Sequence, residues 1–235
     1  MNSEKKSSVV ITQSNYIPWK GYFDQINSCE TFIYYDCVQY TRRDWRNRNQ
    51  IKTPQGLKWL TIPVNSKGNF ASSIDSIRVS NHDWAEQHWE ALRHNYRRAD
   101  CFAEVEDFVR TGYESVRQEE YLSAINKRFI ESIASFLKIQ TQFRDSSEFN
   151  LQNGKTARLV SLVEDVGGNN YISGPAAQSY LDEGSFTEKN ISVEWFDYSG
   201  YQPYNQLHGD FVHGVSILDL LFAVGDEAWK YISKT

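Results

Sequence analysis

Short apolar runs alternate with amphipathic stretches at the amino-terminal end of the chain. Val9 to Gln13 is a β-branched run bounded by polar residues, which is typical of a buried strand. The next stretch opens with Pro18 and repeats apolar residues at helical spacing, so we expect a helix from near Ile17 to about Ser28. Thr31 to Tyr35 predicts a second strand. The order strand, helix, strand is that of a parallel β–α–β unit.

A hairpin pattern follows. Asn49 to Lys52 and Leu57 to Val64 read as two strands, and the segment Thr53 to Gly56 between them carries Pro and Gly at turn spacing. Apolar residues between Ile74 and Val79 predict one more short strand. We therefore expect antiparallel strands outside the first β–α–β unit.

The middle of the chain is helical in pattern. From Trp84 to about Leu137 apolar residues recur at helical spacing, with breaks at Arg98 to Cys101 and at Gly112. Asn81 or Asp83 is placed to cap the first of these helices. Two or three amphipathic helices are expected here.

Strands and helices alternate again towards the carboxyl end. The strands expected there are Phe149 to Leu151, Tyr171 to Pro175 and Ile191 to Phe196. The helices are Thr156 to Val166, Ala176 to Tyr180 and Ile217 to Phe222 behind a Ser216 cap, followed by a last turn or helix from Asp226 to about Ile232. This alternation predicts an α/β protein with a Rossmann-like, mainly parallel sheet flanked by helices. We expect a flexible tail at 1–8 and a single domain at 9–235, with a central helical insertion or subdomain at about 84–137.

Composition and charge narrow the classes of partner. Apolar residues make up 40% of the 235-residue chain without a low-complexity tract, so a globular body is expected, and the net charge of -5 argues against nucleic acid as the main partner. Ile217 to Val224, the longest strongly apolar run, is much shorter than the roughly 20 residues of a membrane span. No apolar signal stretch precedes Val9, and the three cysteines form no C-x-x-C pair. We expect a cytoplasmic protein with reduced thiols and no membrane span.

Positive charge is nevertheless concentrated in one segment. Asp36 to Val64 contains five basic residues, namely Arg42, Arg43, Arg46, Arg48 and Lys52. Because arginine is rarely fully buried unless it is paired, this segment is expected to meet an anion. Arg46 and Arg48 alternate, which places both on one side of an extended chain. Asn47 and Asn49 then point to the other side. Arg42 and Arg43 are expected at the rim of the anion site.

Several spaced motifs resemble those of one family. They are Gln13-x-x-Tyr16-Ile17-Pro18-Trp19-x-Gly21-Tyr22-Phe23, Asp36-x-Val38-Gln39-Tyr40, Asn47-Arg48-Asn49-x-Ile51, Trp59-Leu60-Thr61-x-Pro63-Val64 and Ser216-Ile217-Leu218-Asp219-Leu220-Leu221-Phe222. Together they resemble the WbqC-like family, and the similarity spans nearly the whole chain. The resemblance implies a bacterial protein of O-antigen, lipopolysaccharide or other surface-polysaccharide biosynthesis.

A second similarity is at the level of the fold. The strand ending at Gln13, the glycine at Gly21 and the later Gly174 before a helix are similar in order to nucleotide-binding α/β enzymes of the HIGH-motif superfamily. Lys20 and Tyr22 flank Gly21 where that motif has histidines, which puts adenylyl-transfer chemistry in doubt.

The first expected turn is a candidate phosphate site. Backbone N–H groups at a helix start bind phosphate, Lys20 would add charge and Gly21 would permit close approach. The alternative is that Pro18 only starts a helix whose neighbouring aromatic residues are core. The residues predicted to bind nucleotide or phosphate are Gln13, Lys20, Gly21, Tyr22, Arg46, Arg48 and Gly174.

Sugar-reading and catalytic groups are expected nearby. Asp36 ends the second strand, the usual place for a catalytic or ribose-binding carboxylate in an open α/β sheet, although a turn cap is the alternative. His208 lies in an aromatic and polar stretch and is a candidate general base, with ordinary loop packing as the alternative. The residues predicted to bind substrate are Gln39, Tyr40, Asn47, Asn49 and Gln206. No metal site is expected, because the histidines at 82, 88 and 94 do not share a helix face.

The family resemblance and these residues lead to one main hypothesis. It is an enzyme that transfers an acyl or aminoacyl group to a nucleotide-linked amino sugar, with ATP or an activated acyl donor as the cofactor to test. The alternatives are a nucleotidyltransferase of the HIGH-motif type and a non-catalytic nucleotide-sugar-binding protein. The expected partners are the nucleotide-linked sugar and a small acyl or amino-acid donor; the oligomeric state, a homo-oligomer included, stays open.

Overall fold

A five-stranded parallel sheet forms the centre of the computed structural model, which describes residues 6–65 and 71–232. Its strands are β1 (Ser8–Thr12), β2 (Thr31–Tyr34), β5 (Gln142–Asp145), β6 (Asn170–Ser173) and β7 (Ser192–Trp195). They lie in the order β5-β2-β1-β6-β7, and each neighbouring pair is parallel. The expected α/β, Rossmann-like architecture is confirmed. Most of the tail predicted at 1–8 lies outside the described residues.

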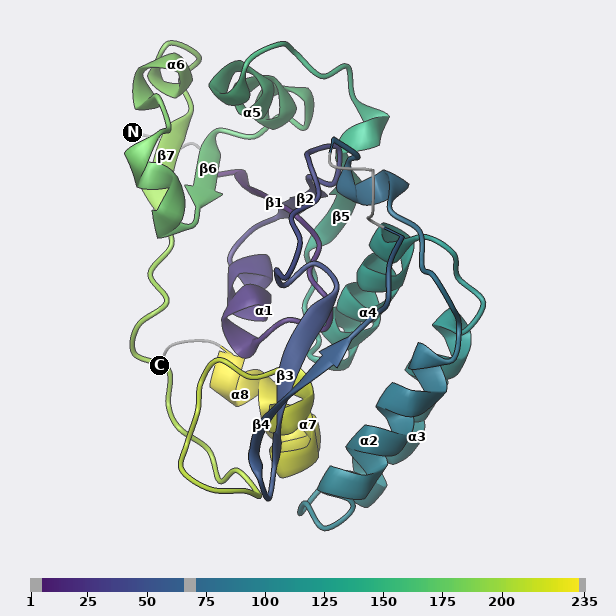
Figure 1. Ribbon diagram of the computed structural model, residues 1–235. Coiled ribbons are helices and arrows are strands. Elements are labelled where there is room, and N and C mark those ends of the chain that lie inside the picture. Colours follow the sequence, from purple (N-terminus) through teal and green to yellow (C-terminus); the bar gives the residue numbers. More distant parts are fainter. Residues whose placement is uncertain (1–5, 66–70, 233–235) are drawn as a thin grey trace.

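The strand residues alternate between two apolar layers, as the period of a β-strand requires. Val9 and Ile11 face a layer with Val163 of α5 and Phe186 of α6, while Val10 faces the larger layer on the other side. Figure 1 shows α5 and α6 on one face of the sheet and α1 and α4 on the other. Both faces of the sheet are covered, which is typical of parallel sheets.

The helices connect the strands and cover the sheet. They are α1 (Lys20–Asn27), α2 (Trp84–Tyr96), α3 (Phe102–Val116), α4 (Leu122–Phe136), α5 (Lys155–Asp165), α6 (Glu183–Thr187), α7 (Ile217–Val224) and α8 (Trp229–Ile232). The parallel pairing of β1 with β2 across α1 confirms the predicted β–α–β unit. The three central helices share the larger apolar layer with α1 and the sheet. No helix in residues 6–65 and 71–232 is long and apolar enough to span a membrane.

The predicted hairpin is also confirmed. β3 (Arg48–Thr53) pairs antiparallel with β4 (Gly56–Thr61), and Thr53 lies opposite Gly56. Gly56 has φ of 106°, a conformation that favours glycine. The hairpin is separate from the sheet and lies beside α7 (Figure 1).

Four local predictions were wrong. The first helix begins at Lys20, because Ile17 has φ of 37° and cannot start a right-handed helix. Gly112 lies inside α3, where a Cβ would stand only 3.2 Å from Phe129 Cε1, so the glycine permits close packing of α4 and breaks nothing. The remaining two errors concern strands.

The strands expected at Ile74–Val79 and at Phe149–Leu151 do not form. Ile74–Ser76 is a 3-10 helix, η1, and Val79 makes only an isolated bridge with Val64. The sheet has two edge strands, β5 and β7, and the polar residues of β5 gave no strand pattern. An edge strand packs on fewer neighbours, so its sequence is less constrained.

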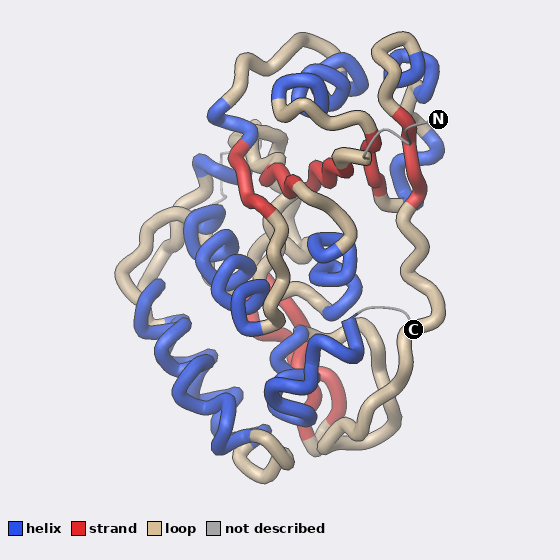
Figure 2. Tube along the Cα trace, turned by 180° about the vertical axis from the view of Figure 1, so that it is seen from behind, coloured by secondary structure: helices blue, strands red, loops and turns tan. Residues whose placement is uncertain are grey.

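A long connection from β7 to α7, residues 196–216, lies outside the helical layer (Figures 1 and 2). The ammonium of Lys52 on β3 fastens it by donating to Gln206 Oε1 at 2.9 Å, Gly209 O at 3.3 Å and Asp210 O. Gln206 in turn bonds both backbone groups of Val212. One buried lysine therefore joins the hairpin to this connection.

Candidate functional site

The strand order creates a crevice at the carboxyl ends of β1 and β6. From β1 the chain passes to β2 on one side, while from β6 it passes to β7 on the other. The loops that follow the two strands therefore diverge, and ligands of open α/β sheets bind at such a switch point. A cavity of about 850 Å³ lies there, which is within the usual size of a ligand site.

The charged side chains in the described lining of this crevice are all positive. Lys155 and Arg158, one helical turn apart at the start of α5, are its cationic lining residues, and its described lining contains no carboxylate and no imidazole. Gly154 precedes the helix with φ of 99°, and no side chain caps the helix start. The first backbone N–H groups of α5 thus add to the positive potential. In a chain with net charge -5, this crevice favours an anionic ligand.

Phenol groups form much of the remaining wall. Tyr198 donates to Gln25 Oε1 at 3.1 Å, and burial raises the pKa of Tyr198 to about 12. Burial also raises the pKa of Tyr35, against the opposing effect of Arg158. Both phenols are protonated at neutral pH and cannot act as bases, and the Tyr198 oxygen, whose proton goes to Gln25, can accept a hydrogen bond from a ligand.

Three predicted site residues line the crevice: Gln13, Gln39 and Gly174. Gln13 follows β1 and its Oε1 accepts from Arg46 Nη2 at 2.9 Å. Gly174 follows β6, and a Cβ at this position would lie 3.7 Å from Tyr198 Oη, in ordinary contact. The sequence therefore predicted a site residue at the carboxyl end of each of the two central strands, β1 and β6.

Asp36 lies behind the crevice and is 1% exposed. Its carboxylate accepts from Ser14 N at 2.8 Å, from Ser14 Oγ at 2.7 Å and from the Ser123 hydroxyl of α4. This arrangement joins the loop after β1 to α4 through residues distant in sequence, so it differs from the local turn cap considered as the alternative for Asp36. Its catalytic role stays a prediction.

The predicted phosphate turn packs against the connection 196–216. Lys20 is 2% exposed, donates to Gln202 O at 2.7 Å and has its Nζ within 6 Å of the ring centres of Tyr201, Tyr204 and Phe211. Burial lowers the pKa of Lys20 to about 8. These contacts hold the ammonium among aromatic rings and away from the crevice lining.

Gly21 and Tyr22 have packing roles on the same turn. A Cβ on Gly21 would overlap the indole of Trp19, so glycine lets this ring lie against the helix. Tyr22 is buried and its hydroxyl donates to Gln13 O at 2.9 Å. Both residues support the loop that carries Gln13.

The basic segment divides into structural and exposed parts. The amide groups of Asn47 and Asn49 donate to backbone oxygens, that of Asn47 to Ile62 O at 2.8 Å and that of Asn49 to Ile17 O at 2.7 Å. Tyr40 is buried, and its backbone N–H donates to Ser72 O at 2.9 Å. Arg48 instead stacks on an exposed ring, with Cζ 4.1 Å from the centre of Trp59.

Two further predicted residues belong to the long connection. His208 Nε2 bonds the backbone oxygen of Asn95 at 2.8 Å, and Gln206 bonds Lys52 and Val212 as described above. Neither residue is part of the crevice lining. The sequence-predicted set is therefore distributed over several places.

The cationic pair in the crevice was missed by sequence reasoning. The signal was present as Gly154-Lys155 directly before the helix predicted from Thr156, with Arg158 one turn after Lys155 on the same face. What it lacked was any local sign that the start of α5 lies beside β1. No cluster of three or more histidine, cysteine or acidic side chains in the described residues is placed to hold a metal ion.

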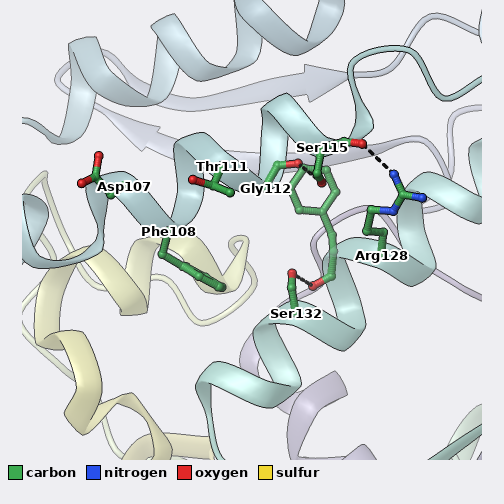
Figure 3. A pocket seen from close by; sticks show the side chains of 8 residues that line it. Asp107, Phe108, Thr111, Gly112, Ser115, Arg128 and Ser132 are labelled. Atoms are coloured by element: carbon green, nitrogen blue, oxygen red, sulfur yellow. Dashed lines mark hydrogen bonds between the residues drawn. The ribbon is translucent and has the colours of Figure 1, made fainter.

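Another cavity, of about 370 Å³, separates parts of α3 and α4 (Figure 3). Phe108 and Phe129 contribute its apolar wall. Its polar groups bond the helices themselves: Arg128 donates to Ser115 O at 2.6 Å, and Ser132 to Phe129 O at 3.1 Å. The first of these bonds joins α4 to α3, and the second lies within α4.

The fold and the crevice define a Rossmann-like α/β protein with a positively charged site at the switch point of its sheet. Residues 13–231 match the model of the WbqC-like protein family, and the chain belongs to that family. A relative named uncharacterized protein Rv1507c, of Mycobacterium tuberculosis, is 50% identical over 224 residues, which cover 95% of this chain and 96% of the relative. No solved structure matches the chain.

Proposed function

We propose that this chain binds a nucleotide-linked sugar in the crevice between β1 and β6 and modifies it during surface-polysaccharide assembly. The observation that carries the proposal is the cationic crevice lining, with Lys155 and Arg158 at an uncapped helix start and no acidic group in the lining that the structure describes. Guanidinium and backbone N–H groups are the usual ligands of phosphate. Membership of the WbqC-like family supports the polysaccharide context.

The reaction we propose is acyl or aminoacyl transfer to an amino group of the sugar. The amine nitrogen attacks the carbonyl carbon of an activated donor, either a thioester or an acyl phosphate anhydride. A C–N bond forms, the bond from the acyl carbon to the donor's leaving group breaks, and that group departs with the electron pair. The proton lost by the amine goes to the leaving thiolate or phosphate.

A non-catalytic nucleotide-sugar-binding role is the second candidate. It is favoured by the crevice lining, which in the described residues offers phenols, hydroxyls, amides and the Cys37 thiol but no carboxylate or imidazole to act as a base at neutral pH. The two candidates share the same ligand site and differ only in turnover.

Binding is tested first, by calorimetry with uridine diphosphate and with uridine. We expect the diphosphate to bind the wild-type protein more tightly, and Arg158→Ala to weaken its binding about tenfold, since a charge-assisted bond to phosphate is lost. Arg93→Ala is the matched control, because Arg93 lies on α2, pairs with Glu90 and is not among the crevice lining residues. Equal affinities of both variants and wild type would contradict the site.

A steric variant tests the same crevice without changing charge. Gly174 has φ of -68°, so any residue can adopt its backbone conformation, and Gly174→Leu should fill the cavity near Tyr198. We expect loss of diphosphate binding with an unchanged melting temperature. Retained binding would place the ligand elsewhere.

Turnover separates the two candidates. Wild-type protein is incubated with a uridine-diphosphate-linked amino sugar and either an acyl thioester or ATP with amino acids, and the product is weighed by mass spectrometry. A mass gain of one acyl or aminoacyl group supports transfer. Binding without any mass gain across the panel supports the non-catalytic role.

A further inference from the structure

A third cavity, apart from the crevice and from the cavity between α3 and α4, differs from the crevice in character. It has a volume of about 370 Å³ and is lined by Asn15, Pro18, Trp19, Trp45, Asn49, His213 and Gly214. Its wall comes from three places: the loop between β1 and α1, the loop before β3 together with the first residues of β3, and the end of the connection 196–216. Three segments that are distant in sequence thus enclose it.

Among the residues that the structure describes, the lining of this cavity has no charged group at neutral pH. It includes no acidic side chain, lysine or arginine from that part of the chain. Burial, with a smaller effect of Lys20, lowers the pKa of His213, so its imidazole is neutral at pH 7. The crevice favours an anion, whereas this lining suits an uncharged ligand that has both apolar faces and hydroxyl groups.

Aromatic surface continues from the cavity onto the hairpin. Trp45, in the cavity wall, is 42% exposed, and Trp59 on β4 is 39% exposed. Their ring centres are 5.3 Å apart, and Arg48 stacks on Trp59. Large apolar side chains left in water beside a cavity mark a binding surface. Trp combines an apolar face with a polar N–H, which suits the C–H face and hydroxyls of a sugar ring.

Polar groups at the cavity are held in fixed orientations. Arg46 donates to Asn15 Oδ1, which leaves the Asn15 side-chain N–H₂ as the donor for a ligand. Asn49 is held by Tyr16 O, Ile17 O and Gln50 N. Arg46 also bonds Gln13 of the crevice at 2.9 Å. One guanidinium therefore stands between the two sites and links a wall residue of each.

We infer that this cavity, with its aromatic extension through Trp45 to Trp59, is a binding site for the uncharged pyranose ring of a saccharide, separate from the crevice. The assignment goes beyond the proposed function, because a neutral sugar ring requires none of the cationic groups of the crevice. In a protein that acts on a nucleotide sugar, it would hold an acceptor or a neighbouring sugar ring.

Saturation-transfer NMR tests the inference with four free sugars: glucose, galactose, N-acetylglucosamine and N-acetylgalactosamine. We expect transfer from wild-type protein to the ring protons of at least one of them. Trp45→Ala should weaken that binding about tenfold through the lost stacking surface, and Trp45→Phe should restore part of it. Trp229→Ala is the matched control, because Trp229 on α8 is 43% exposed and lies outside the cavity lining.

Calorimetry with uridine diphosphate makes the two sites distinguishable. Trp45→Ala should bind the diphosphate as wild type does, while Arg158→Ala should still bind the neutral sugar. Failure of diphosphate binding in every protein, with sugar binding intact, would overturn the proposed function alone. No transfer to any of the four sugars, or equal transfer in Trp45→Ala, would overturn the saccharide site.

Discussion

Asp36 shows how one side chain can hold a site together without contacting its ligand. The carboxylate is buried and accepts three hydrogen bonds, two from Ser14 and one from Ser123. Such bonds to a charged group stabilise more than neutral ones, and a buried donor left without its acceptor is costly. The loop that carries Gln13 into the crevice therefore depends on this carboxylate.

Asp36→Asn is expected to lower the free energy of unfolding by about 2 to 3 kcal/mol, since the amide N–H₂ would face hydroxyl donors. Urea unfolding followed by fluorescence measures the change. Asp107→Asn, at an exposed position on α3, should change stability by less than about 0.5 kcal/mol. An Asp36 variant of wild-type stability that had lost turnover would instead favour the catalytic role predicted from the sequence.

At the scale of elements, a buried histidine joins the helical layer to the first loop of the sheet. His88 of α2 shares a hydrogen bond of 2.8 Å with the Tyr16 hydroxyl, which also bonds Tyr113 of α3 at 2.7 Å. Burial lowers the pKa of His88 to about 4. Two helices and the loop after β1 thus meet at one neutral imidazole.

This pKa shift predicts a loss of stability in acid. In the unfolded chain His88 takes up a proton below about pH 6.5, whereas in the folded chain it does so only near pH 4. The unfolded state therefore binds more protons across this window. The contribution of His88 to the free energy of unfolding falls by about 3 kcal/mol as the pH drops from 6.5 to 4.

Urea unfolding of wild type and His88→Gln between pH 7.5 and 4 measures that contribution. The variant should show a smaller fall in stability across the window, whatever its stability at pH 7.5. His94→Gln, on the exposed side of the same helix, should keep the wild-type pH dependence. The same pH dependence in the His88 variant would contradict the assignment.

At the scale of the whole molecule, the connection 196–216 covers the hairpin and supplies part of the wall of the cavity that Trp45 lines. Its position depends on Lys52, whose ammonium is fully used by Gln206 and by the backbone oxygens of Gly209 and Asp210. The segment has no strand or helix of its own, so these bonds replace regular backbone pairing.

Lys52→Ala should therefore open this connection locally. We expect the protected amides of residues 201–213 to exchange at least about tenfold faster, because loss of a charge-assisted bond is worth about 1.5 kcal/mol or more. Hydrogen exchange followed by mass spectrometry measures this, with Lys58→Ala on the exposed face of β4 as control. Unchanged exchange in the Lys52 variant would show that aromatic packing alone holds the segment.

The sequence by itself determined the elements whose signals are local. The β-branched run at Val9, the turn chemistry at Pro54 to Gly56 and the Ser216 cap each reflect contacts among near neighbours, and they predicted β1, the hairpin and α7 correctly. The alternation of these elements was sufficient for the α/β class, because buried parallel strands need helices between them. The polar edge strand β5 had no such pattern.

Tertiary structure alone decided which residues meet. Asp36 reaches a hydroxyl 87 positions away on α4, and the start of α5 lies beside Gln13 only because β6 pairs with β1. A local sequence pattern determines which positions are buried but not which residue each one contacts across the core. The sequence was therefore equally consistent with a ligand-binding role and with a structural role for Lys20 and Asp36. The strand order placed the cations of α5 in the crevice, and packing against the connection 196–216 held Lys20 among aromatic rings.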